Sequence, residues 1–577
     1  MGVEGFKGYL QHSYEFRRCF LKKVEGRISS LFMDCNSIFH GASRDVYKLG
    51  DKYTDKERRD LMKVSKEKLE EQHISAIIRD ITSFIEKFNP EDNLIMAVDG
   101  VANSGKLQQQ KPRRFLKAVE NGENDLLIFD SNSITPGTLF MKRLDRAIVE
   151  WLETYKGYLP EKTVYSSHLQ PGEGEHKIFD YIRRGDYIKG RGHQIVLGMD
   201  NDLIILSTVS PMKNLFMVPE DGKPAVDVTK MREVLLEVMG FKGSDPIRTY
   251  QDFAVIVTLL GNDFLPKFPN VPTRSSDAMR IIFKCYRWMG KHLTDLKNNI
   301  IWKNYHTFLQ NFDRYNGKDT SSGRGYNYIQ YFQRPPKIST YPEIMENTII
   351  MNKRGVPVNQ VYDREEHILD FDLEKFTSEW YRKQFNPDVL QWDGERVKGP
   401  DKKLILDMCV NYLKTLQWCQ YYYTVGYKYI SNLHFYHYTY SPVMTTVVNV
   451  LQLLIKKEKT SGLRNVKWSE KELQITPVHQ LLSVIPFGSI DLIEEYRDQY
   501  ERHLMTLNPV TFYVSRENMD KDHHRKAILP SVNVPHIDEI MKKEGIVVPD
   551  ELEEVDDLVI IRDNRLEDLS VSMEEIF

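Results

Sequence analysis

The sequence has few cysteines, and none of them are placed to bind zinc or to form a redox pair. Only five occur among 577 residues, and no two have the spacing Cys-x-x-Cys. Disulfide-rich scaffolds are typical of small secreted domains, so this scarcity predicts a protein of a reducing, intracellular compartment. A chain of this length can bury a large core without covalent cross-links.

Long hydrophobic runs and an excess of one charge are also absent. No run approaches the roughly 18 apolar residues of a membrane span, so we expect no membrane association. The first six residues lack an apolar signal core and are expected to stay on the mature protein. Lys and Arg number 79 against 82 Asp and Glu, a net charge of −3. This balance excludes a uniformly basic coat, but a local basic patch could still bind nucleic acid.

Short apolar runs alternate with charged, periodic stretches over the first 270 residues. Runs at 30–33, 94–98 and 194–197 have the length of buried strands. The stretch 55–88, which ends at Asn89-Pro90, is typical of one or two helices. Strand, helix and strand in this order predict an α/β fold with a mostly parallel sheet.

The remainder of the chain has a different, more helical pattern. Helical periodicity begins near 270, and a segment rich in Gly, Ser, Asn and Tyr at 319–334, closed by Pro335-Pro336, is typical of a loop. We therefore expect an α/β core at 1–270, a helical extension and loop at 271–334, and a helical, aromatic-rich region at 335–577 that packs on the core. Its acidic stretch 550–557 is expected to be a solvated face or a loose tail.

Carboxylates follow the apolar runs. Three runs end at Asp34, Asp99 and Asp200, and the carboxyl ends of parallel strands meet in one crevice. The other acids that we expect at this sheet edge are Glu173, Glu175, Asp202 and Asp263. A single aspartate after a strand is more often a helix cap, but capping explains a set of seven poorly. Seven charges would repel strongly unless cations neutralise them, and oxygen ligands suit Mg²⁺ or Mn²⁺ rather than zinc. Two such ions about 4 Å apart can activate a water and stabilise a leaving oxygen.

A basic face follows Asp99. If the chain is helical from Lys106, then Gln110, Arg113 and Arg114 lie at i+4, i+7 and i+8 on roughly the same face, although Pro112 could bend it. A lysine, an amide and two guanidinium groups suit a terminal phosphate. A solvated basic helix explains the spacing equally well, and closeness to Asp99 favours the phosphate pocket.

Several of these segments resemble the 5′→3′ exoribonucleases of the Xrn family. In the first half they are Met1–Val3, Asp34–His40, Asp99–Ala102, Ser131–Thr138, Pro171–Lys177, Met199–Leu203 and Gly261–Pro266. In the second half they are Gln417–Tyr423, Tyr436–Pro442, Leu481–Pro486 and Pro535–Glu539. The resemblance implies a compact form of the enzyme, without a long C-terminal extension, and a PIN- or flap-nuclease-like core.

The resemblance also implies roles for individual residues. The seven acids match the catalytic metal ligands of the family, and Lys106, Gln110, Arg113 and Arg114 match its 5′-monophosphate pocket. His40 matches a histidine that stacks on a leading nucleotide during translocation. The family pairs that histidine with a tryptophan, for which this sequence has Asn432 and His434. We take His434 as the candidate stacking partner, and Tyr427, Tyr429 or Phe435 as alternatives.

The implied activity is processive hydrolysis of single-stranded RNA with a 5′-monophosphate to mononucleotides, with two Mg²⁺ or Mn²⁺ ions. The implied setting is RNA decay by a monomer in the cytoplasm, or else the nucleus, with decapping factors as candidate partners. Two alternatives remain open. One is a flap-type nuclease acting on branched DNA, and the other is an RNA-binding scaffold that has lost activity.

Overall fold

The structure is a computed structural model, and it describes residues 6–50, 52–122, 129–271, 275–316, 377, 380–381, 402–438, 440–515 and 526–561. The loop expected at 319–336 and the first residues of the family-like motif at Met1–Val3 lie outside these ranges.

An eight-stranded sheet organises the first part of the chain, in the order β1-β7-β6-β5-β2-β3-β4-β10. The strands are β1 (Phe20–Leu21), β2 (Ile28–Asp34), β3 (Asn93–Ala97), β4 (Lys162–Ser166), β5 (His193–Leu197), β6 (Leu215–Val218), β7 (Ala225–Asp227) and β10 (Leu558–Ile561). The five central strands β6, β5, β2, β3 and β4 are parallel, and the outer pairings β1–β7, β7–β6 and β4–β10 are antiparallel. The prediction of an α/β fold with a mostly parallel sheet is confirmed.

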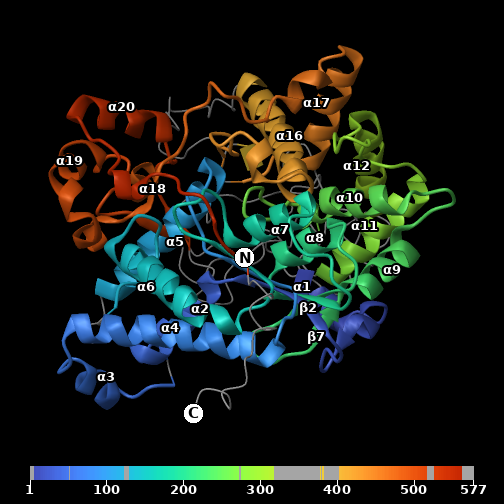
Figure 1. Cartoon of the computed structure of the whole chain (residues 1–577). Helices are drawn as coiled ribbons and strands as arrows, with labels where there is room; N and C mark the ends of the chain where they lie inside the picture. The colour runs from blue at the N-terminus through green and yellow to red at the C-terminus, as the bar shows by residue number, and fades with distance from the viewer. Residues whose placement is uncertain are drawn as a thin grey trace.

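Helices cover both faces of this sheet (Figure 1). They are α1 (Phe6–His12), α2 (Asn36–Val46), α3 (Asp55–Leu61), α4 (Lys66–Phe88), α5 (Ser104–Gly122), α6 (Leu139–Tyr155), α7 (Gly174–Arg184), α8 (Asn201–Val209), α9 (Val228–Met239) and α10 (Pro246–Val257). Side chains of β2 alternate between two cores, with Leu31 and Met33 packed beneath α2, α4 and α6, and Phe32 packed beneath α7 and α8. Burial on both faces explains why the strands are apolar runs rather than alternating patterns.

The expected helical stretch 55–88 is two helices, α3 and α4. Ser65 begins α4 by accepting a hydrogen bond from the backbone N–H of Lys68. Asn89 ends the helix in the left-handed conformation, with φ of 43°, immediately before Pro90.

The second part of the chain is mainly helical. Its elements include α11 (Ser275–Met289), α12 (Trp302–Asn316), α16 (Lys402–Thr424), α17 (Met444–Lys456), α18 (Pro477–Val484), α19 (Arg497–Gln499) and α20 (Val534–Glu544). Helix α16 is buried from Met408 to Tyr423 almost without interruption and shares one hydrophobic core with α7, α8 and α10. The aromatic-rich region therefore packs directly on the sheet domain.

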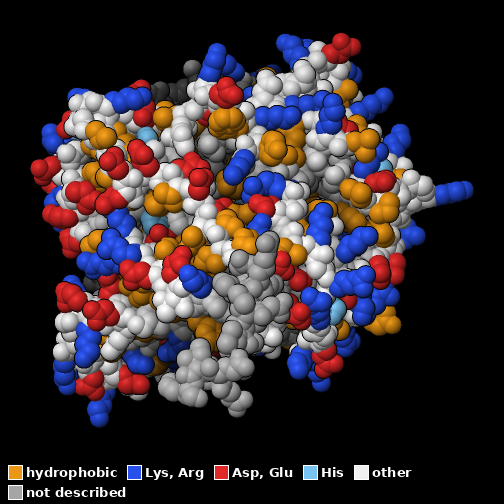
Figure 2. All heavy atoms as spheres, in the orientation of Figure 1, with side chains coloured by type: hydrophobic (Ala, Val, Ile, Leu, Met, Phe, Trp, Pro, Cys, Tyr) orange, Lys and Arg blue, Asp and Glu red, His pale blue; other side chains and the backbone are white. Residues whose placement is uncertain are grey.

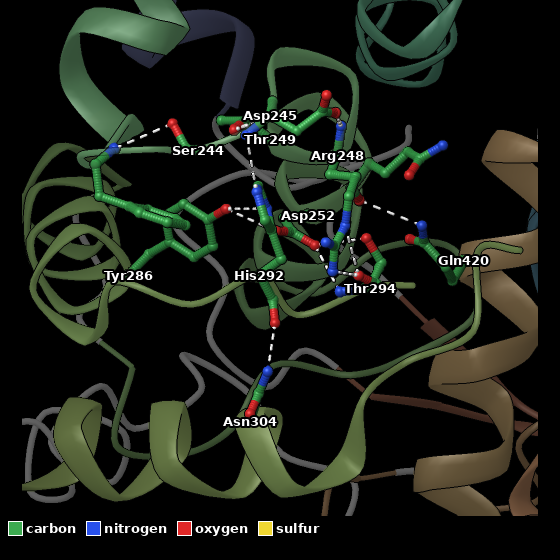
Figure 3. A network of polar contacts seen from close by, with 12 residues as sticks. Ser244, Asp245, Arg248, Thr249, Asp252, Tyr286, His292, Thr294, Asn304 and Gln420 are labelled. Carbon is green, nitrogen blue, oxygen red and sulfur yellow. Dashed lines mark hydrogen bonds and ion pairs between the residues drawn. The ribbon is translucent and has the colours of Figure 1, made fainter. Parts of the chain in front are cut away.

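A buried polar network joins α10 to α11 and to the loop that precedes α12 (Figure 3). The carboxylate of Asp252 is fully buried and accepts hydrogen bonds from the hydroxyl of Tyr286 at 2.6 Å and from Nδ1 of His292 at 2.7 Å. Its other oxygen accepts from the backbone and the hydroxyl of Thr294, at 2.7 and 2.6 Å. Nε2 of His292 accepts the backbone N–H of Asp245 at 3.0 Å, so every polar atom at this centre has a partner.

The C-terminal region also contains strands that the sequence pattern did not indicate. Strands β8 (Tyr513–Ser515) and β9 (Lys526–Ile528) form a two-stranded sheet, and β10 pairs antiparallel with β4. The acidic stretch just before β10 is mostly exposed, as expected of a solvated face, but it is not a loose tail. Lys142 lies 2.5 Å from Glu551, and the hydroxyl of Tyr181 donates to Asp557.

Basic and acidic side chains are interspersed over the face shown in Figure 2, in agreement with the small net charge. No helix in the described ranges combines the length and the apolar character needed to cross a lipid bilayer.

Candidate active site

Three of the acids lie where parallel strands end. Asp34 is the last residue of β2, Asp99 follows β3, and Asp200 follows β5 as the N-cap of α8. Asn36 links the first two, because its backbone N–H donates to Asp34 at 3.3 Å and its side-chain oxygen accepts the N–H of Asp99 at 2.9 Å. Asp200 accepts the backbone N–H of Leu203 at 2.8 Å, so it is a helix cap as well as a member of the cluster.

The loop before α7 ends at Glu173, and Glu175 lies in the first turn of α7; close backbone contacts of the loop position both acids. The N–H of Gly100 donates to the carbonyl of Gly172 at 2.9 Å, and the N–H of Gly172 donates back to Val101 at 2.8 Å. A Cβ on Gly100 would lie only 1.6 Å from the carbonyl oxygen of Gln170, so only glycine fits there.

Gly174 packs against the first two acids. Its N–H donates to Oδ1 of Asp99 at 2.7 Å, and a Cβ at this position would lie 2.7 Å from Oδ1 of Asp34. The glycine thus lets the two neighbouring glutamates approach the strand ends.

The last two acids come from helical elements. Asp202 is in the first turn of α8 and is buried. Asp263 follows α10 and the 3₁₀ turn Thr258–Leu260, so the apolar run before it is not a strand and the expectation that it lies at a strand end is wrong. Gly261 reverses the chain with φ of 84°, and the side chain of Asn262 accepts the N–H groups of Phe264 and Leu265, which fixes the turn. Asp263 therefore reaches the cluster from the α10 side.

The structure brings all seven acids together. Burial, and then the charges of Asp99 and Asp200, raise the pKa of Asp34 well above its usual value. Burial, followed by the charge of Asp263, raises the pKa of Asp202 to about 7. For Glu175, burial and then Asp200 raise the pKa well above the usual range. These shifts have the physical origin expected of like charges held close in a desolvated crevice.

Lys106 lies between two of the acids. Its ammonium nitrogen is 2.5 Å from Oε2 of Glu173 and 3.1 Å from Oδ2 of Asp263. Burial opposes the charge of Lys106, but Glu173 and Asp263 outweigh it and raise its pKa well above the usual value. For Asp263, burial is likewise outweighed by the charge of Lys106, and its pKa is lowered.

Helix α5 carries the four residues of the expected phosphate pocket. The helix runs from Ser104 to Gly122 and continues through Pro112. Arg113 is exposed, while Arg114 donates to the hydroxyl of Thr135 at 2.5 Å. Oε1 of Gln110 and Nε of Arg114 are buried and have no hydrogen-bond partner among the described residues. Lys106 faces the acids, and the other three residues lie one to two turns further along the helix.

The two histidines expected to stack have different surroundings. His40, in α2, is accessible to solvent, and desolvation by the protein around it, with Arg114 and Arg44 nearby, lowers its pKa to about 4. His434 is half-buried, and its Nε2 lies 2.9 Å from the hydroxyl of Thr415 on α16. No ring contact joins the two histidines in the part of the chain that the structure describes. His434 instead lies 6.4 Å from the ring of Trp418.

The alternatives to His434 have different surroundings. Tyr427 packs its ring against Gly172, Phe435 is buried against His437, and Tyr429 is 59% exposed.

Sequence reasoning missed residues that support the acids. The hydroxyl of Tyr422 donates to Glu173, and that of Tyr423 donates to Asp202 at 2.8 Å. Lys177 donates to the carbonyls of Val98 at 2.7 Å and Ser167 at 2.8 Å, which joins the ends of β3 and β4. All three residues lie in the family-like motifs, but only the folded chain shows what they contact.

The donor set fits a hard divalent cation in its chemistry, though not in its present arrangement. It consists of carboxylates alone, and Oε2 of Glu175 is buried without a hydrogen-bond partner. Within the described ranges, no three His, Cys, Asp or Glu side chains are arranged as a metal site. Two of the acids contact the ammonium of Lys106 instead.

Comparison with known proteins shows what the chain is similar to. The family model described as "XRN 5'-3' exonuclease N-terminus" matches residues 1–221. The chain is 25% identical to 5'-3' exoribonuclease 1 of Homo sapiens over 624 aligned residues, which cover 93% of this chain and 34% of that protein.

Fungal relatives match shorter parts of the chain. Identity is 31% over 260 residues to 5'-3' exoribonuclease 1 of Schizosaccharomyces pombe, covering 38% of this chain and 19% of that protein. It is 26% over 348 residues to 5'-3' exoribonuclease 2 of Yarrowia lipolytica, covering 49% and 32%. The chain thus spans about a third or less of the length of these relatives. The N-terminal 221 residues match the family model, and the chain is similar along most of its length to an exoribonuclease of that family.

Proposed function

We propose that this protein is a 5′→3′ exoribonuclease that hydrolyses RNA with a 5′-monophosphate, one nucleotide at a time. The observation that carries the proposal is the contact of Lys106, on the basic helix α5, with Glu173 and Asp263 of the acid cluster. One site would thereby combine a face for a terminal phosphate with a set of carboxylates for divalent cations. The names of the related proteins, 5'-3' exoribonucleases, support the direction of attack and the RNA substrate.

The acids would hold Mg²⁺ or Mn²⁺, two ions by the resemblance. The bound ions would supply a more acidic water and stabilisation of the negative charge that develops on the phosphodiester. The raised pKa values of Asp202, Asp34 and Glu175 mean that ionisation of these carboxyl groups is disfavoured in the metal-free protein. Cation binding would therefore be needed to hold them all ionised. Candidate ligands are Asp34, Asp99, Glu173, Glu175, Asp200, Asp202 and Asp263.

Helix α5 would position the substrate. Arg113 is exposed, and Nε of Arg114 has no partner among the described residues, so both leave donor capacity. Gln110 would donate from its side-chain NH₂ group, because its oxygen can only accept. A terminal phosphate with oxygens free to accept bonds would use this capacity. His40, because its lowered pKa keeps the ring neutral near pH 7, would contribute stacking rather than charge.

The test compares one labelled RNA with a 5′-monophosphate, 5′-hydroxyl, 5′-triphosphate or cap, in Mg²⁺ or EDTA. We expect mononucleotides from the monophosphate RNA only, and no product with EDTA or with the Asp200→Ala variant. Internal cuts that do not depend on the 5′ group would favour a flap-type nuclease. Binding without cleavage would favour the scaffold.

Setting and assembly stay predictions from the sequence. A role in RNA decay, action in the cytoplasm, recruitment by decapping factors and a monomeric state are proposed with the activity and await their own measurements.

A further inference from the structure

Three consecutive tyrosines near the end of α16 direct their hydroxyls to three different partners. Tyr421, Tyr422 and Tyr423 are all buried, at 0–2% exposure. Tyr421 donates to the side-chain oxygen of Asn299 at 2.5 Å, on the loop before α12. The next two tyrosines turn toward the acid cluster, so one short segment offers both site-facing hydroxyls and a matched hydroxyl that faces elsewhere.

The ring of Tyr422 is held on three sides. It stacks on Trp418 with centroids 5.1 Å apart and an interplanar angle of 13°, and Phe264 meets it edge-on at 4.9 Å. The ring of His176 lies 3.8 Å away on α7. With the ring fixed, its hydroxyl is fixed too, and it donates to Oε1 of Glu173. The other oxygen of Glu173 is left for Lys106.

Tyr423 has an equally defined position. Its hydroxyl donates to Oδ1 of Asp202 at 2.8 Å and lies 3.4 Å from the side-chain nitrogen of Asn262. Asn262 is the residue that fixes the turn before Asp263. The hydroxyl of Tyr423 therefore connects Asp202 of α8 with the turn after α10 that holds Asp263.

A phenol has a single proton and can donate only one hydrogen bond. Each tyrosine thus fixes one oxygen of one carboxylate and sets the direction in which the other oxygen points. Carboxylates that bind metal ions are commonly oriented by such outer partners. Helix α16 lies far from these acids in sequence but supplies both partners.

We propose that Tyr422 and Tyr423 are positioning residues for the metal-binding carboxylates Glu173 and Asp202. The inference rests on the proposed function, because it takes these acids as cation ligands. It adds to that function the statement that helix α16 sets cation affinity, through hydroxyls that bind the carboxylates Glu173 and Asp202.

The test measures Mn²⁺ binding to the full chain without RNA, by calorimetric titration, for wild type and for Tyr421→Phe, Tyr422→Phe and Tyr423→Phe. We expect Tyr422→Phe and Tyr423→Phe to weaken Mn²⁺ binding roughly 10–100-fold. Tyr421→Phe should leave Mn²⁺ affinity unchanged, since its hydroxyl contacts Asn299. Thermal unfolding of all four proteins checks that each is folded.

A second readout separates positioning from general damage. In the two site-facing variants the Mg²⁺ concentration for half-maximal turnover should rise, while KM for 5′-monophosphate RNA at saturating Mg²⁺ should stay near the wild-type value. Equal Mn²⁺ affinity in wild type and both variants would overturn the positioning role and leave the proposed function intact. A similar loss in Tyr421→Phe would also overturn it, because the effect would then be structural. Failure of the wild-type protein to bind Mn²⁺ would overturn the proposed metal chemistry itself.

Discussion

The ammonium of Lys106 lies 2.5 Å from Oε2 of Glu173, so the basic helix α5 and the acidic loop before α7 are joined by an ion pair within the acid cluster. The lysine also contacts Asp263 at 3.1 Å. A single side chain therefore connects the two halves of the site that the sequence showed as separate patterns.

Replacing Lys106 should reduce the preference for a 5′-monophosphate. In Lys106→Met we expect the ratio of kcat/KM for monophosphate over hydroxyl RNA to fall roughly 10–100-fold, as for loss of a hydrogen bond to a charged group. Lys142→Met, which removes a lysine of α6 paired with Glu551, is the control. An unchanged ratio in Lys106→Met would show that the lysine serves only the acids.

The acid cluster should make the metal-free protein less stable as pH rises. Asp202 has a pKa of about 7 in the folded chain and near 4 when unfolded, so between these values the unfolded state holds fewer protons. Folding stability from this group is therefore present at low pH and lost as pH rises through about 7.

Comparison with Asp202→Asn isolates this contribution. In EDTA, the melting temperature of the variant relative to wild type should rise between pH 5 and pH 8, and Mg²⁺ should reduce the difference at pH 8. A difference that is constant with pH would contradict the raised pKa.

Gly174 should tolerate no side chain. In Gly174→Ala the added Cβ would lie 2.7 Å from Asp34 and 3.1 Å from the carbonyl of Ala97, so the loop must move. A displacement on the scale of 1 Å at reacting groups costs about 10²-fold in rate, and we expect a loss of kcat of that size. Gly41→Ala on α2, where nothing lies within 4 Å of the new Cβ, is the matched control and should retain activity. Equal kcat in both variants would refute the close packing.

The buried Asp252 should matter for stability rather than for chemistry. In Asp252→Asn the new amide would place an N–H group against donors, and we expect a loss of about 2–3 kcal/mol in the free energy of unfolding. Denaturant titration measures this loss, and kcat of the folded variant should match wild type. A variant as stable as wild type would mean that the network in Figure 3 reorganises around the amide.

Local sequence patterns were enough to predict the parallel strands and the acids that follow them. Leu31, Phe32 and Met33 are apolar because both faces of β2 are buried, and a buried strand has no room for alternation. Asp34, Asp99 and Asp200 follow from the same pattern, since strand direction fixes which edge they share.

Contacts between distant segments could not be predicted from local sequence patterns. The apolar run before Asp263 is too short to distinguish helix from strand by periodicity, and packing against α16 decides it. The partners of Tyr422 and Tyr423 lie more than two hundred residues away. His434 follows the family pattern only loosely, and its contact with Thr415 depends on how α16 is placed.

The pairing of β10 with β4 has a consequence for synthesis of the chain. One edge of the sheet is covered by residues 558–561, which leave the ribosome roughly 400 residues after β4 and, at about 5–20 residues per second, ~20–80 s later. During that time the backbone groups of β4 on this side have no partner strand, and an open edge invites pairing with other chains. The nascent protein would therefore depend on chaperones to keep this edge from pairing with other chains until β10 is made.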